Sequence, residues 1–127
     1  MVIIQRRSRR KATSGRYKAG GRSKRQFEAG SAPTMSTIGE KKVKAVRIIG
    51  NNVKSKLIRS ATVNVIDQST KKAVKATLKE VVENKANKFF IRRNILTKGA
   101  VVDTDKGKVK ITNRPGQDGN LNGVIVK

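Results

Sequence analysis

The chain contains no cysteine and no histidine among its 127 residues. Without cysteine there are no disulfides, no thiol nucleophile and no Cys-based metal site. Without histidine the chain lacks the side chain that most often serves as a general base near neutral pH. It also has neither the glycine-rich phosphate loop of nucleotide-binding proteins nor the serine elbow of hydrolases. We therefore expect no enzymatic activity, no cofactor, no bound metal and no small-molecule substrate.

Long hydrophobic runs are absent as well. No apolar stretch approaches the ~18–20 residues that a transmembrane helix needs. The opening residues Met1–Ile4 are apolar, but arginines follow almost at once and the stretch is too short for a secretory signal. The sequence therefore predicts an intracellular protein that is soluble, or soluble when bound to its partner.

Acidic residues are scarce: eight Asp and Glu stand against 31 Lys and Arg, and the formal net charge is +23. Residues 1–39 contain ten basic residues and one acid, Glu28, whereas residues 40–127 contain 21 basic residues and seven acids. Both parts are strongly basic, and self-repulsion of this size disfavours a compact state unless a polyanion neutralises it. We expect nucleic acid to be that polyanion, with an anionic membrane surface as the competing interpretation.

The most basic stretch is Gln5–Gln26, which holds ten Lys or Arg and no acid. It contains no Val, Ile, Leu, Met or Phe, so it has no apolar surface to bury while its like charges repel. We predict that Met1–Gly39, which contains this stretch, is disordered in the free protein and ordered on RNA, although a solvated tail or a targeting signal is the alternative. Seven of the ten are Arg, which suits bidentate phosphate contacts and stacking on bases. The candidate RNA-binding residues here are Arg6, Arg7, Arg9, Arg10, Lys11, Arg16, Tyr17, Lys18, Arg22, Lys24 and Arg25.

The composition changes after this stretch. Phe27–Gly39 is rich in Ser, Thr, Gly and Ala and contains Pro33, which is typical of a loop or linker. From Lys41 onward, β-branched residues recur in short runs. We therefore place the domain boundary near Gly39–Glu40, with a basic RNA-binding extension at residues 1–40 and a folded body at residues 41–127.

The body shows the pattern of short strands. Apolar residues alternate with polar ones at period two, most clearly in Ala61–Asp67, where Val63 and Val65 share one face. The expected strands are Val43–Ile49, Val53–Ile58, Ala61–Asp67, Val74–Lys79, Ala100–Asp103, Lys108–Thr112 and Leu121–Val126. Six or seven short strands with frequent turn signals predict a mainly all-β fold, a small closed or partly open β-barrel, with a sandwich as the alternative.

Four local patterns concern turns or possible sites, and three of them are open to more than one interpretation. Leu78–Asn87 has helical spacing, but the alternation before it favours a strand that continues through a bulge. Pro115 and Gly116 fit the second and third positions of a type II turn. Asp103 and Asp105 are a possible carboxylate pair that turn chemistry explains better, and Asp118–Gly123 matches only the start of a calcium-binding loop.

Polar residues at the ends of the expected elements supply candidates in the body. Basic side chains on a rigid frame can fix the register of an RNA contact, whereas an isolated one is as often a solvated surface group. The candidates of this kind are Arg92, Arg93, Asn94, Lys98 and Arg114.

Six segments, in chain order, carry a resemblance to a known family: Arg6–Gly15 (RRSRRKATSG), Thr37–Lys44 (TIGEKKVK), Val46–Lys54 (VRIIGNNVK), Val81–Asn87 (VVENKAN), Ile91–Ala100 (IRRNILTKGA) and Ile111–Gly119 (ITNRPGQDG). Together they resemble the ribosomal protein S8e family. The compact length is similar to that of the archaeal branch, since nothing corresponds to the long insertion of eukaryotic members. The chain departs from the family pattern at Ser14 and Asn51, where the pattern has glycine.

The resemblance implies a β-barrel body and a basic N-terminal extension that binds 16S-type ribosomal RNA (rRNA) in the small ribosomal subunit, next to neighbouring small-subunit proteins. It implies a cytoplasmic protein of the ribosome, with no membrane partner and no catalysis. The matched segments add Lys41, Lys42, Arg47 and Lys54 to the candidate RNA-binding residues. A related branch acts in ribosome assembly, which is the nearest alternative, and a chromatin-type DNA-binding protein is the other.

Overall fold

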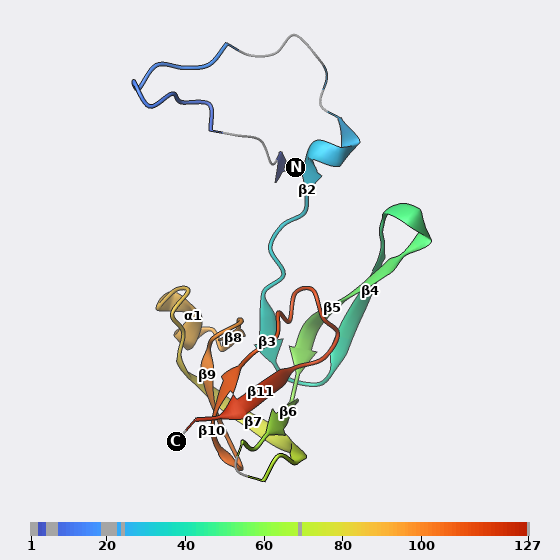
Figure 1. Cartoon of the computed structure of the whole chain (residues 1–127), viewed down its shortest axis with the longest axis vertical. Helices are drawn as coiled ribbons and strands as arrows, with labels where there is room; N and C mark the ends of the chain where they lie inside the picture. Colours follow the sequence, from blue (N-terminus) through green and yellow to red (C-terminus); the bar gives the residue numbers. More distant parts are fainter. Residues whose placement is uncertain (1–2, 5–7, 19–22, 24, 69, 127) are drawn as a thin grey trace. The chain divides into compact units, whose positions relative to one another are not determined.

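The computed structural model describes residues 3–4, 8–18, 23, 25–68 and 70–126. The chain divides into two compact units, Met1–Pro33 and Thr34–Lys127. We call them the extension and the body; Figure 1 shows the elements of each.

Within its described residues, the extension contains only short elements. Strand β1 (Ile3–Ile4) pairs antiparallel with β2 (Ala29–Gly30), and the 3-10 helix η1 (Gln26–Glu28) directly precedes β2. An isolated antiparallel bridge joins Arg10 to Arg16. None of these elements has an amphipathic face of the length that normally stabilises a helix or sheet by packing.

The body is built around a closed five-stranded barrel. Its strands, in order around the barrel, are β10 (Gly107–Ile111), β11 (Asn122–Ile125), β6 (Thr62–Ile66), β7 (Ala73–Glu83) and β9 (Val101–Thr104), and β9 pairs with β10 to close it. All neighbours are antiparallel except β11 and β6, which are parallel. The expected all-β fold and barrel are confirmed.

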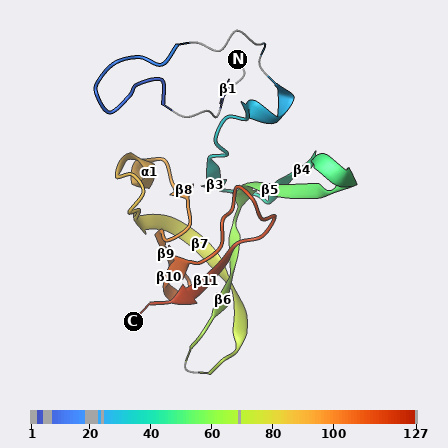
Figure 2. The same cartoon turned by 45° about the horizontal axis from the view of Figure 1, so that its top comes forward.

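A second, four-stranded sheet adjoins the barrel in the order β4 (Lys42–Arg47), β5 (Val53–Ser60), β3 (Ser36–Ile38), β8 (Ile95–Leu96). The short helix α1 (Phe89–Arg92) precedes β8, and the 3-10 turn η2 (Ile49–Asn51) joins β4 to β5. Figures 1 and 2 both show the β4–β5 hairpin extending beyond the barrel. We call this hairpin, residues 42–60, the arm.

Strand β3 lies where the sequence predicts only a linker. It pairs with β5 in parallel and with β8 antiparallel, so these residues belong to the sheet of the body. The linker interpretation of Ser36–Ile38 is therefore wrong. The strand escapes the hydrophobic pattern because its buried residue, Ser36, is polar. The Ser36 hydroxyl is accommodated in the interior by donating a hydrogen bond to the Leu57 carbonyl at 2.7 Å.

The core follows the predicted alternation. Among the described residues, the buried apolar side chains of the barrel strands come from alternate positions: Val63 and Val65 of β6, Ala76 and Leu78 of β7, Val102 of β9, and Val109 and Ile111 of β10. Leu57 of β5 joins them with no exposed surface. Burial of each large aliphatic side chain contributes roughly 1.5–3 kcal/mol relative to its exposure.

The ambiguous segment after Leu78 is a strand. Leu78 and Val81 are three residues apart, and a regular strand would point them to opposite faces. The register of β7 against β9 shifts between Leu78 and Glu80, which returns Val81 to the interior, where it is 3% exposed. The helical spacing thus comes from a bulge, and the preferred strand interpretation is confirmed through Glu83.

The turn around Pro115 differs from the expected type. A type II turn needs a positive φ at its third residue, but Gly116 is not among the described glycines with positive φ. Instead the Arg114 carbonyl accepts hydrogen bonds from the backbone N–H groups of Gln117 and Asp118, both at 2.9 Å. The type II prediction is therefore wrong, and the segment forms a turn with the hydrogen-bond pattern of a single helical turn.

Candidate nucleic-acid interface

The extension displays its cations on a small loop. The Tyr17 N–H donates to the Arg9 carbonyl at 2.9 Å, and the Lys11 N–H donates to the Gly15 carbonyl at 2.8 Å. Ser14 has φ 64°, the left-handed conformation that glycine adopts most readily, so the departure from the family's glycine falls on the position that forms the bend. Five predicted residues are exposed on this loop: Arg9, Arg10, Lys11, Arg16 and Lys18.

Tyr17 and Arg25 are also exposed candidates in the extension. The Lys11 ammonium lies 5.5 Å from the centroid of the Tyr17 ring, within the range of a cation–π contact. Arg25 precedes η1, and its N–H donates to Glu28 Oε2 at 3.2 Å. Glu28, the one acid before residue 40, is only 8% exposed. Arg6, Arg7, Arg22 and Lys24 lie outside the described residues.

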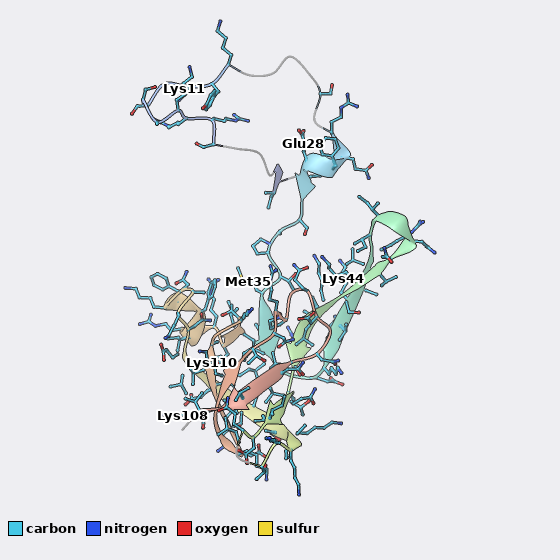
Figure 3. All side chains as sticks on the ribbon, viewed as in Figure 1. Lys11, Glu28, Met35, Lys44, Lys108 and Lys110 are labelled. Carbon is cyan, nitrogen blue, oxygen red and sulfur yellow. The ribbon has the colours of Figure 1, made fainter. Side chains whose placement is uncertain are left out.

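The arm gathers the second set of cations. Lys42 and Arg47 lie on β4, Lys54 lies on β5, and Lys41 directly precedes β4, where its ammonium donates to Asn120 Oδ1 at 3.2 Å. Sequence reasoning missed three further cations of this hairpin, Lys44, Lys56 and Arg59. Lys44 pairs directly with Lys56, and Lys42 with Arg59, so cations face one another across the two strands. Figure 3 labels Lys44 on the arm.

A readable sequence signal marks these missed residues. From Lys41 to Ile66 the chain has seven Lys or Arg and no acid. Like charges directly opposite one another on paired strands are destabilising. A hairpin of this composition therefore gains stability when an anion binds it, which is the property expected of a phosphate-binding surface.

The opposite edge of the same sheet carries a third set. Arg92 ends α1 and Arg93 follows it, both exposed, while Lys98 is exposed in the turn after β8. A shallow depression beside α1 is lined by Lys88, Phe89, Ile91 and Arg92. Because β8 and β4 are the two edge strands of one sheet, this set and the arm lie at its two ends.

Asn94 and Arg114 are held by the fold. Asn94 has φ 48° and is half-buried, and its Oδ1 accepts a hydrogen bond from the Val81 N–H at 3.1 Å, directly at the bulge of β7. Arg114 has an exposed side chain, while its backbone N–H donates to Asp118 Oδ2 at 3.2 Å. The structure thus assigns Asn94 a structural contact, and its predicted contact with RNA stays a prediction.

Three acids of the body, Glu80, Asp103 and Asp105, lie on the barrel strands or in the turn between β9 and β10. Glu80 of β7 pairs with Asp103 of β9, and Lys108 of β10 pairs with Asp103 from the other side, so this row of the barrel contains both signs of charge. Asp105 has a turn role, because its Oδ1 accepts a hydrogen bond from the Thr77 N–H at 2.9 Å. The interpretation as a turn residue is thus supported for Asp105, whereas it is wrong for Asp103, which lies on strand β9.

No group of three or more acidic, His or Cys side chains that could hold a metal occurs within the described part of the chain. Asp118 is instead engaged by the Arg114 N–H and by Asn113 Nδ2. Across the same described residues, no helix is long and apolar enough to cross a membrane.

Fold and charge together define a class: a small, strongly basic β-barrel protein with a basic extension and an acid-free arm. A family model described as Ribosomal protein S8e matches residues 4–126. The chain therefore belongs to the ribosomal protein S8e family, and it is a structural component rather than an enzyme. The resemblance predicted from the six segments is confirmed.

Curated relatives cover nearly the whole chain. It is 48% identical to the small ribosomal subunit protein eS8 of Nanoarchaeum equitans, over 90% of both chains. It is 45% identical to the protein of that name from Methanocorpusculum labreanum, over 99% of this chain and 100% of the relative. The protein of that name from Methanocella arvoryzae is 49% identical, over 96% of this chain and 97% of the relative.

Proposed function

We propose that this protein is a structural constituent of the small ribosomal subunit, in the cytoplasm, and that it binds 16S-type rRNA by neutralising phosphates. Residues 1–40 supply a flexible set of cations, all of which lie in the extension, and the body supplies a rigid set at the two ends of its second sheet. Neighbouring small-subunit proteins are its other partners. The names of the relatives support the ribosomal part of this proposal.

The observation that carries the RNA-binding part is the distribution of charge. The extension has ten basic residues against one acid, and the arm and its preceding lysine have seven against none. Neither segment contains enough acids to balance its own cations, so a partner that supplies anions is expected to bind there. The phosphates of a folded rRNA provide anions at the required density.

A salt titration of rRNA binding tests the proposal. Each neutralised phosphate releases condensed counterion, so the logarithm of affinity falls with the logarithm of salt concentration by about 0.7–0.9 per contact. Changing Arg9, Arg10, Arg16 and Lys18 to Gln should flatten this slope by about three units. The matched control changes Lys71, Lys72, Lys75 and Lys79 of the β6–β7 hairpin, which removes the same charge and should flatten the slope by less than about one unit. Equal slopes for the two variants would contradict the proposed role of the extension.

Two further measurements on the unmodified protein distinguish the proposed function from the assembly-factor and chromatin-type alternatives. A small-subunit constituent co-sediments with mature subunits after a high-salt wash, whereas an assembly factor is found on precursor particles and leaves before maturation. A chromatin-type protein binds duplex DNA at least as tightly as rRNA at equal salt. Tighter binding to duplex DNA, or loss from washed mature subunits, is the result that rejects the proposal.

A further inference from the structure

The end of the arm exposes an apolar surface. Ile49 is 89% exposed, Val53 is 64% exposed and Ile48 is 42% exposed. Soluble proteins rarely leave a contiguous group of large aliphatic side chains uncovered unless a partner covers it. We call these three residues the arm tip.

The arm tip is held outward by a well-defined turn. Gly50 has φ 75° and Asn51 has φ 60°, so two successive left-handed residues reverse the chain. The Ile48 N–H donates to the Asn52 carbonyl at 2.8 Å, and Asn52 Nδ2 donates to the Ile49 carbonyl at 3.2 Å. These bonds close the turn around Ile49, so its exposure is a property of the fold.

The base of the arm is anchored to the rest of the body. A Cβ built on Gly119 would lie 3.0 Å from Ser55 Cβ and 3.4 Å from Val43 Cγ1, which shows that the loop before β11 packs closely against the arm there. The Leu57 N–H donates to the Pro115 carbonyl at 2.9 Å. From Lys44 to Ile49 the hairpin extends a further five residues, roughly 17 Å at the rise of a β-strand. The arm tip therefore stands well clear of the core on an anchored support.

The positive charge around the arm tip indicates which class of partner it binds. Arg47 and Lys54 flank it, Lys44 lies further down the same hairpin, and no acid occurs between Lys41 and Ile66. A polyanion with apolar faces is complementary to such a surface, and RNA supplies both features, since its bases are apolar on their faces and its backbone is anionic. A protein partner would need to combine an apolar pocket with an acidic rim.

We propose that the arm tip is an RNA-insertion element that takes an unpaired base in a loop or bulge of the rRNA. Ile49 packs against the face of the base, as aliphatic wedges do at unstacked steps, while Arg47 and Lys54 hold the flanking phosphates. Regular A-form duplex is excluded as the site because its deep groove is too narrow and its shallow groove exposes no base face. The inference rests on the proposed function, since it assigns one element of the rRNA contact.

The test uses the whole protein and the organism's own 16S-type rRNA. Ile49→Ser should weaken binding about tenfold at every salt concentration while the salt slope stays unchanged, because an apolar contact releases no counterions. Lys54→Gln should instead lower the slope by about 0.7–0.9. The control is Ile66→Ser, which removes an aliphatic side chain that is 48% exposed on the barrel strand β6 and should leave affinity within twofold.

A photoreactive amino acid at position 49 supplies the second measurement. In reconstituted subunits it should crosslink to one base that chemical probing shows to be unpaired in the free RNA and protected in the complex. If the unmodified protein binds rRNA but Ile49→Ser behaves like Ile66→Ser, or if the crosslink forms to another protein, the insertion element is rejected while the proposed function stands. If the unmodified protein shows no salt-dependent binding of rRNA, the proposed function itself is rejected.

Discussion

The extension and the body are both strongly basic, but they differ in how their cations are supported. The extension, with ten basic residues and one acid, has no buried aliphatic side chain among the residues whose burial the structure describes. The body, with 21 basic residues and seven acids in residues 40–127, encloses an aliphatic core and fixes its cations on strands and turns. The first arrangement gives reach and adaptability, and the second gives a fixed geometry. RNA recognition benefits from both, because phosphate contacts can be supplied flexibly whereas register needs a rigid frame.

The largest expected effect comes from breaking the core. Leu57 has no exposed surface, so Leu57→Ala should destabilise the body by about 3–5 kcal/mol, a large fraction of the stability of a small domain. Urea denaturation followed by far-ultraviolet circular dichroism measures it. Phe27→Ala in the extension, where the ring is 78% exposed, is the control and should change stability by less than about 0.5 kcal/mol. A comparable loss at Phe27 would show that the extension belongs to the same cooperative unit.

Limited trypsin digestion compares the local order of the two regions. In the free protein the extension should be cut about a hundredfold faster than the body, because cleavage follows the free energy of local opening, which is near zero in segments without buried contacts. Addition of rRNA should protect the extension. The resistant fragment should begin near Thr34 and not near Lys41, because β3 is part of the sheet of the body. Equal protection of both regions in the free protein contradicts the predicted disorder.

Paired charge removals distinguish reach from fixed geometry. Arg92→Gln with Arg93→Gln, and Arg9→Gln with Arg10→Gln, each remove two cations and should each lower the salt slope by about 1.4–1.8 units. The body pair should also change RNA protection at one locus, because its position is fixed by α1 and β8. The extension pair should leave every protected locus in place. Hydroxyl-radical footprinting reads out the difference, and a shifted footprint for both pairs would remove the distinction.

The barrel could be predicted from the sequence because its core residues alternate. Val63 and Val65, and later Val109 and Ile111, point inward as period two requires. Strand β3 could not be predicted in this way, since its inward residue is Ser36, whose burial depends on a hydrogen bond to Leu57, 21 residues later. The parallel pairing of β11 with β6 also escapes local patterns, because it joins residues 58 apart in the chain, such as Asn64 and Asn122.

The sequence predicts those parts of the candidate site that amino-acid composition alone can locate. The basic stretch of the extension and the acid-free run of the arm are both visible in the sequence, although the predicted RNA-binding residues include neither Lys44 nor Lys56. The structural contact of Asn94 was not visible, because it depends on the bulge that presents the Val81 N–H. The exposure of Ile49 could not be predicted from the sequence either. An isoleucine in a β-rich run is usually a core residue, and only the conformation of the turn η2 shows that Ile49 points outward.

The smallest expected effect tests whether the two regions respond differently to one kind of substitution. Ser14 and Asn51 both occupy the left-handed region, with φ 64° and φ 60°, and both replace glycines of the family pattern. Glycine adopts this conformation without a Cβ clash, although its greater freedom in the unfolded chain offsets part of the gain.

Asn51→Gly should therefore stabilise the body by about 0.5 kcal/mol, which corresponds to a rise of roughly 2–4 °C in Tm for a domain of this size. Ser14→Gly relieves the same local strain but should leave Tm unchanged, because we expect the extension to take no part in the cooperative unfolding of the body. Thermal melting of the two variants beside the unmodified protein makes the comparison, with Lys11→Gln as a control for changes in the extension loop. A rise in Tm for Ser14→Gly that matches the rise for Asn51→Gly would mean that the two regions unfold together, and the extension would then have to be treated as part of the folded domain.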